Sequence, residues 1–107
     1  MTTNYPKSVR IGPTDYEIKE QEGLSAGDSL WGQIRYGNNQ IVIESSICES
    51  RKREVLAHEL AHGILFEAGF EDHTEEQANR IGKVLAMVLR DNDFGFMRDS
   101  VTDKEDE

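Results

Sequence analysis

The spacing of apolar residues changes once along this chain, near residue 50, and that change limits the fold more than any other feature. Before it, two runs at about 30–36 and 40–44 alternate between apolar and polar residues and flank Gly37-Asn38-Asn39, a turn sequence that tolerates positive φ. After it, apolar residues recur every three to four positions, which is typical of helices packed along one side. Strands followed by helices predict an α+β domain.

The N-terminal half predicts a small antiparallel sheet. The two runs around the Gly-Asn-Asn turn form a predicted β-hairpin. Upstream, "SVRIG" and "YEIKEQE" read as further strands separated by Gly12-Pro13, and "EGLSAGDS" reads as a loop. The sheet precedes both helices in the chain.

The C-terminal half predicts two packed helices. The first begins near Ser50, a candidate N-cap, and ends near Gly69. The second has Thr74 as its predicted N-cap, with Gln77 completing a capping box, and runs to about Asp91. Because the connection between them is short, we expect the helices to lie roughly antiparallel.

Length and composition indicate one domain and exclude several partners. The 107 residues suffice for a single core, which we assign to 1–97, and the acidic residues 98–107 form a predicted disordered tail. A net charge of −9 argues against nucleic acid as a partner. No window approaches the roughly 20 apolar residues of a membrane span, no signal peptide is evident, and Cys48 has no disulfide partner. We therefore expect a cytoplasmic protein.

The first predicted helix contains the motif H-E-x-x-H, formed by His58, Glu59 and His62. Residues four apart lie one above the other on a helix, so the two imidazoles can bind one metal ion. Catalytic zinc requires three protein ligands and one open position for water. Glu59 would then act as general base on that water. A five-residue motif that fixes only three positions also occurs by chance on ordinary helices, so the motif alone does not establish a zinc site.

The third ligand has three candidates. "EEQAN" at the start of the second helix places Glu75 and Asn79 on one face, so Glu75 could bind the metal while Asn79 hydrogen-bonds a histidine ligand from behind. Glu76 is the alternative from the same turn. His73, in the loop, would give a three-histidine site. Arg35 and Tyr36, near the hairpin, are weaker candidates to stabilise an oxyanion.

Two segments, "SRKREVLAHELAHGIL" and "EEQANRIGKVLAMVL", resemble the ImmA/IrrE-type metallopeptidases, especially short members carried by phages and prophages. The resemblance covers roughly residues 30–92. It implies a minimal zincin-like core, with Glu75 completing the zinc site of the two motif histidines and Glu59 as general base. Where the family often has a Phe-Ala pair, this chain has Ile81-Gly82. Zincin-like peptidases commonly bind substrate along a sheet edge, here either the 40–44 strand or its neighbour at 30–36.

The sequence therefore predicts a gluzincin-type zinc metallopeptidase that hydrolyses peptide bonds of an intracellular protein or peptide. One alternative is a non-catalytic zinc-binding regulatory or interaction protein of a phage or mobile element. Another is a zinc hydrolase similar to SprT-type proteins, with His73 as the third ligand.

Overall fold

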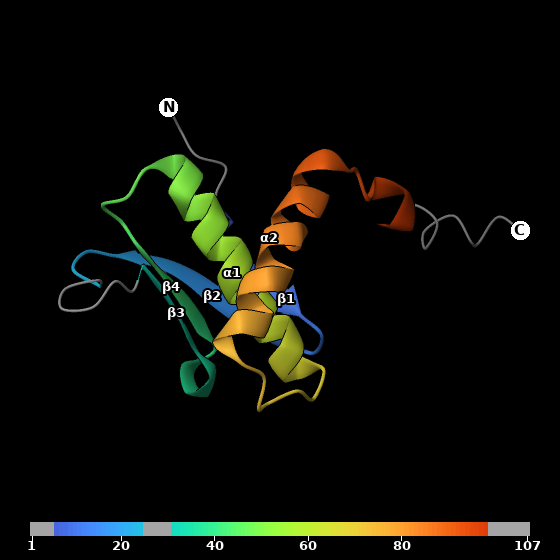
Figure 1. Ribbon diagram of the computed structural model, residues 1–107, viewed down its shortest axis with the longest axis horizontal. Helices are drawn as coiled ribbons and strands as arrows, with labels where there is room; N and C mark the ends of the chain where they lie inside the picture. The colour runs from blue at the N-terminus through green and yellow to red at the C-terminus, as the bar shows by residue number, and fades with distance from the viewer. Residues whose placement is uncertain (1–5, 25–30, 99–107) are drawn as a thin grey trace, which may run out of the picture.

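A computed structural model describes residues 6–24 and 31–98 of the protein. Within these ranges the chain forms a four-stranded sheet followed by two helices (Figure 1). The elements are β1 (Ser8–Ile11), β2 (Thr14–Gln21), β3 (Gly32–Arg35), the short 3-10 helix η1 (Tyr36–Asn38), β4 (Gln40–Glu44), α1 (Glu49–Glu67) and α2 (Glu75–Asp91). This order confirms the predicted α+β class.

The sheet is mixed, so the prediction of a wholly antiparallel sheet is wrong. Its strand order is β1-β2-β4-β3, and β4 pairs in parallel with β2, with Ile18 opposite Ile41. The other two pairs are antiparallel. The reason lies in β4, where Ile41, Val42 and Ile43 are all buried. A strand that is apolar on both faces is stabilised inside a sheet, between two neighbours. Consequently β4 is an inner strand, and β3 is the outermost strand at that end of the sheet.

The predicted hairpin is present between β3 and β4. The chain turns through η1, and Asn39 then adopts a left-handed conformation with φ of 53°. β3 is shorter than the predicted strand at 30–36, because Trp31 lies before it and Tyr36 already belongs to η1. Residue 30 lies outside the described residues.

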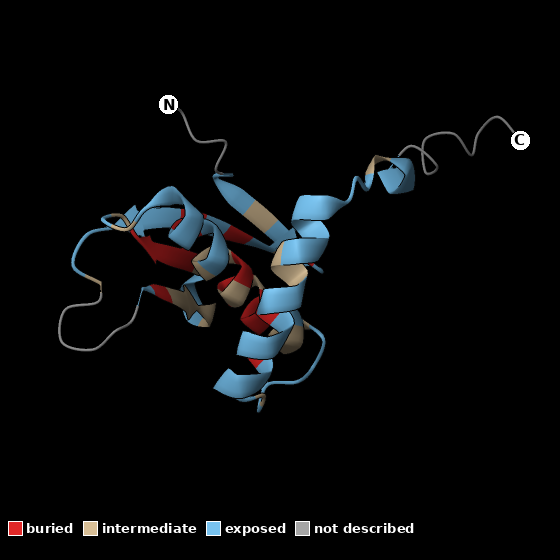
Figure 2. Cartoon of the chain, turned by 45° about the horizontal axis from the view of Figure 1, so that its top comes forward, coloured by how far each residue is buried: buried red, intermediate tan, exposed pale blue. Residues whose placement is uncertain are grey.

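Helix α1 lies on the sheet and covers the core. Buried side chains of the sheet, above all Tyr16, Ile41 and Ile43, pack with partly buried apolar residues of α1. Figure 2 shows buried residues, in red, on the strands and on the helices. The predicted N-cap at Ser50 is wrong, because the helix begins at Glu49 with Cys48 as N-cap and no side-chain capping bond. The predicted end is confirmed, since α1 stops at Glu67 and Gly69 follows with φ of 101°.

Helix α2 begins with the predicted capping box and runs back across α1 (Figure 1). Its contact side is made of the smallest residues, Ala78 and Gly82, both of which are buried. A Cβ at Gly82 would lie 3.0 Å from the Cα of His58, so glycine permits this close approach. Ile81 and Val88 of the same helix are exposed, and most of α2 is drawn as exposed in Figure 2.

In the described part of the chain, no helix is both long and apolar enough to cross a membrane. The predicted acidic tail lies, from residue 99 onward, outside the described residues.

Candidate metal centre

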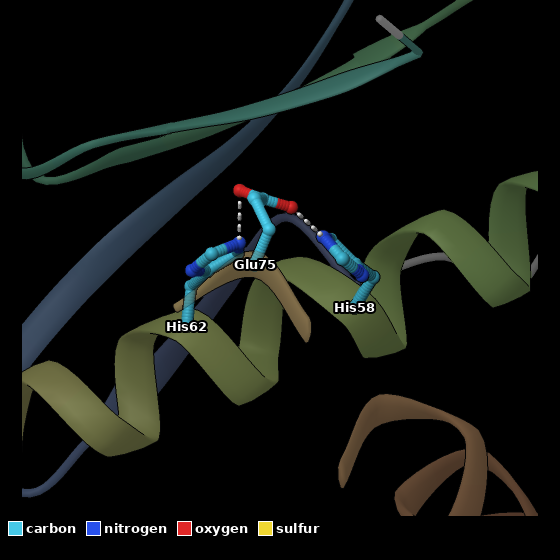
Figure 3. A group of neighbouring side chains, drawn as sticks. All are labelled: His58, His62 and Glu75. Carbon is cyan, nitrogen blue, oxygen red and sulfur yellow. Dashed lines mark hydrogen bonds and ion pairs between the residues drawn. The ribbon is translucent and has the colours of Figure 1, made fainter. Parts of the chain in front are cut away.

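Three side chains from two helices converge on one point. His58 and His62 lie one turn apart on α1, and Glu75 is the first residue of α2. One ligand atom from each lies within 4.8 Å of the others. The carboxylate bridges the two rings, with 3.2 Å from Oε1 to His58 Nε2 and 3.0 Å from Oε2 to His62 Nε2 (Figure 3). The two helices together therefore form a compact set of nitrogen and oxygen ligands.

The donor set fits zinc. Zinc bonds of about 2.0–2.2 Å in a tetrahedral arrangement separate neighbouring ligand atoms by roughly 3.3–3.6 Å. The two nitrogen–oxygen contacts here are slightly shorter, at 3.2 and 3.0 Å, and the three ligand atoms lie within 4.8 Å of one another. Burial lowers the pKa of His62, which favours its neutral form. Nε2 of each imidazole faces an oxygen of the Glu75 carboxylate, so the three side chains present two nitrogens and a carboxylate to one point. Two histidines and one carboxylate form a ligand set that catalytic zinc uses.

Glu59 is a buried carboxyl group beside this cluster. It is 5% exposed, and its side chain has no hydrogen-bond partner in the described part of the chain. Burial, and then the charge of Glu75, raises the pKa of Glu59 to about 8. Buried polar groups are normally hydrogen-bonded. A buried carboxyl group that lies next to potential metal ligands, and that no other described residue hydrogen-bonds, fits a role in binding water or substrate and in accepting a proton.

Glycine at the start of β3 makes room for this carboxyl group. A Cβ at Gly32 would overlap the side chain of Val55 and lie 3.0 Å from Oε2 of Glu59. Glu59 therefore lies against the edge strand, while the neighbouring His58 turns towards α2. The carboxyl group is thus close to both the sheet edge and the candidate ligands.

A family model for the IrrE N-terminal-like domain, a peptidase family, matches residues 10–94. The chain belongs to this family. The match extends from β1 to just beyond α2, so it includes the first two strands as well as the two motif helices. Membership supports a peptidase of the metal-dependent type, and the His-Glu cluster is consistent with zinc. Searches of curated proteins and of solved structures gave no match.

Two of the predicted site residues, the alternative ligand Glu76 and the predicted hydrogen-bond donor Asn79, lie away from the cluster. Glu76 forms an ion pair with Arg80 at 2.8 Å, and both side chains are exposed. Asn79 is exposed and makes no side-chain hydrogen bond within the described residues. The predicted hydrogen bond from Asn79 to a histidine of the cluster is therefore absent among the described residues.

His73 makes the contact with a motif histidine that was predicted for Asn79. Its Nε2 lies 2.8 Å from Nδ1 of His62, the ring nitrogen that does not face Glu75. From the sequence, His73 was predicted only as an alternative third ligand. A loop histidine has no periodicity that could have indicated which nitrogen of His62 it would meet.

Of the two candidate oxyanion donors, Tyr36 lies beside the cluster and Arg35 is engaged elsewhere. The Tyr36 hydroxyl donates to the carbonyl oxygen of His62 at 3.4 Å, and its ring stacks on Phe66 at 4.0 Å. Burial, followed by the charges of Glu59 and Glu75, raises the pKa of Tyr36, so the phenol stays protonated. Arg35 donates to Gln33 at 2.7 Å. The oxyanion role stays a prediction.

Proposed function

We propose that the protein is a zinc-dependent peptidase in which His58, His62 and Glu75 bind the metal and Glu59 is the general base. The observation that carries the proposal is the buried carboxyl group of Glu59, which has no hydrogen-bond partner among residues 6–24 and 31–98, beside three converging side chains. Membership of a peptidase family supports the reaction class. The function is hydrolysis of peptide bonds.

Each residue has a separate task in the proposed reaction. A zinc ion, when bound, supplies a Lewis acid that lowers the pKa of a water molecule at the site to about 7. Glu59 takes the proton from that water as it attacks the peptide carbonyl. Glu59 then passes the proton to the leaving amine. Its raised pKa in the metal-free site means that its surroundings accommodate the protonated form, which is the form it takes between these two steps.

The proposed substrate is a protein or peptide segment in extended conformation. β3 is one of the two edge strands of the described sheet and begins at Gly32, against Glu59. An extended segment added along β3 would use the backbone groups that face away from β4. Its scissile bond would then lie within reach of the Glu59 carboxyl group. An intracellular protein is the proposed natural source of that segment.

The test combines metal analysis with a cleavage assay. We expect one zinc ion per chain in the wild type, and cleavage of members of an unstructured peptide library, followed by mass spectrometry. Glu59→Gln should retain zinc but lose about 10³-fold or more in kcat/KM, because the proton acceptor is gone. Glu54→Gln is the matched control, since Glu54 is an exposed glutamate on the same helix and pairs with Arg51.

Each failure points to a different correction. A wild type that binds zinc but cleaves no peptide would favour a non-catalytic zinc-binding protein. Cleavage by Glu59→Gln at the wild-type rate would remove Glu59 as general base. A folded wild type that binds no zinc would overturn the metal centre itself.

A further inference from the structure

The two ring nitrogens of His62 face two different residues. Nε2 faces Glu75 at 3.0 Å, whereas Nδ1 faces Nε2 of His73 at 2.8 Å. The other nitrogen of His73, Nδ1, lies 2.5 Å from the carbonyl oxygen of Phe70. A continuous line of contacts thus leads from a backbone carbonyl, through His73, to the nitrogen of His62 on the side away from the candidate metal site.

The chemistry of the carbonyl fixes the direction of these hydrogen bonds. A carbonyl oxygen only accepts, so Nδ1 of His73 must carry the hydrogen. In neutral His73, Nε2 is then an acceptor, and Nδ1 of His62 must be the donor. With its hydrogen on Nδ1, neutral His62 presents a lone pair on Nε2, on the side of Glu75. That is the tautomer that a metal ligand needs.

The carbonyl at the start of this line is held in place by α1. The backbone N–H of Phe70 donates to the carbonyl of Leu65 at 2.8 Å, and that of Gly69 donates to Phe66 at 3.0 Å. The Phe70 carbonyl also accepts from the backbone N–H of His73 at 3.3 Å. The loop is therefore tied to the same helix that carries His62, so the acceptor and the histidine it orients keep a fixed relation.

The two histidines of the motif differ in this support. Within the described residues, Nδ1 of His58 has no hydrogen-bond partner, and the His58 side chain is 25% exposed. The side chain of His62 is 11% exposed and is held at both nitrogens. Orientation of the imidazole by the loop is thus specific to the more buried histidine.

We propose that His73 is a positioning residue that keeps the hydrogen of His62 on Nδ1 and so leaves Nε2 free to bind zinc. The inference rests on the proposed function, because it requires His62 to be a zinc ligand. It assigns His73 to a place outside the ligand set. Partners that orient a ligating histidine typically contribute about 10–100-fold to metal affinity.

The test measures zinc affinity by competition with a chelator in four proteins. His73→Ala removes the acceptor, and we expect about 10–100-fold weaker zinc binding than in the wild type. His73→Gln keeps an acceptor oxygen near the position of Nε2, so it should recover most of the affinity. Asp72→Ala is the matched control, because Asp72 is an exposed neighbour in the same loop and should leave affinity unchanged.

A second measurement does not depend on any variant folding. Nitrogen NMR of the zinc-loaded wild type distinguishes the tautomers of each imidazole. We expect His62 to be protonated at Nδ1 and metal-bound at Nε2. His73 should be protonated at Nδ1 and metal-free.

The outcomes separate this inference from the proposed function. If the wild type binds no zinc, both fall. If it binds zinc but His73→Ala binds equally tightly, only the positioning role is overturned. A metal-bound His73 nitrogen, with no recovery in His73→Gln, would make His73 a ligand and would also overturn the positioning role.

Discussion

On α1 the candidate site is enclosed, whereas on α2 it is open to solvent. Glu59 is buried against β3, and the His62 side chain is 11% exposed. The side chain of Glu75, in the first turn of α2, is 78% exposed. The two glutamates are close enough for the charge of Glu75 to raise the pKa of Glu59. They nevertheless have opposite environments.

This difference separates two roles that one residue type can perform. An exposed carboxylate at the start of a helix is open to a cation from solvent and can bind it directly. A buried carboxyl group has a raised pKa and is suited to exchanging protons. The enclosed side therefore provides the proposed general base, and the open side provides the proposed anionic ligand. Three predictions test the contrast, from the largest expected effect to the smallest.

Replacing the exposed glutamate should affect metal binding most. Glu75→Gln removes the anionic ligand, and we expect zinc affinity to fall at least about 100-fold, or roughly 3 kcal/mol. Glu76→Gln, one residue later on the same exposed turn, should leave affinity nearly unchanged, because Glu76 pairs with Arg80. Chelator competition measures both. Equal affinities of the two variants would mean that the open side does not bind the metal.

The buried glutamate should make metal-free stability depend on pH. Folding raises the pKa of Glu59 from 4.5 to about 8, so the folded state keeps a proton that the unfolded state loses. The contribution of Glu59 to the free energy of unfolding should therefore be greatest below about pH 4.5 and fall as pH rises towards 8, by up to about 1.4 kcal/mol per pH unit. Glu59→Gln, which does not titrate at this position, should lack this component.

Denaturant unfolding of the two metal-free proteins between pH 5 and 7 measures the difference. We expect the stability of the wild type relative to Glu59→Gln to decrease by about 2–3 kcal/mol over this range. If the free energies of unfolding of the two proteins changed equally with pH, Glu59 would be ionised in the folded protein. The buried and the exposed glutamate would then not differ in charge.

The smallest expected effect is on the free energy of unfolding and concerns the N-cap of α2, the helix that carries Glu75. Thr74 accepts a hydrogen bond from the backbone N–H of Gln77 at 3.1 Å, while its own N–H donates to the Gln77 side chain at 2.9 Å. Thr74→Ala should lower the free energy of unfolding by about 1 kcal/mol. Thr74→Ser keeps the hydroxyl and should lose less. Thermal unfolding compares the two variants, and equal losses would contradict a capping role.

Local patterns predicted the elements more accurately than their arrangement. The capping box at Thr74, the stop at Gly69 and the hairpin turn at Asn39 depend on residues close in sequence, and all three are present. The pairing of β4 with β2 joins segments more than 20 residues apart. The consecutive buried residues Ile41–Ile43 were a signal for an inner strand.

Sequence by itself determined that His58 and His62 share one side of a helix and that Glu75 opens the next, because helical periodicity specifies which residues share a face. Periodicity does not specify the distance between two helices. Here Ala78 and Gly82 bring α2 close to α1, and only that packing places Glu75 between the imidazoles.

Tertiary structure likewise decided the environment of Glu59 and the partner of His62. Burial depends on what covers a residue, and Gly32 from a distant strand leaves room for the Glu59 carboxyl group. The contact between His73 and His62 depends on the path of a loop tied to the end of α1. The motif therefore identified the residue types, while long-range packing set which groups surround each side chain, and charge states and tautomers depend on those groups.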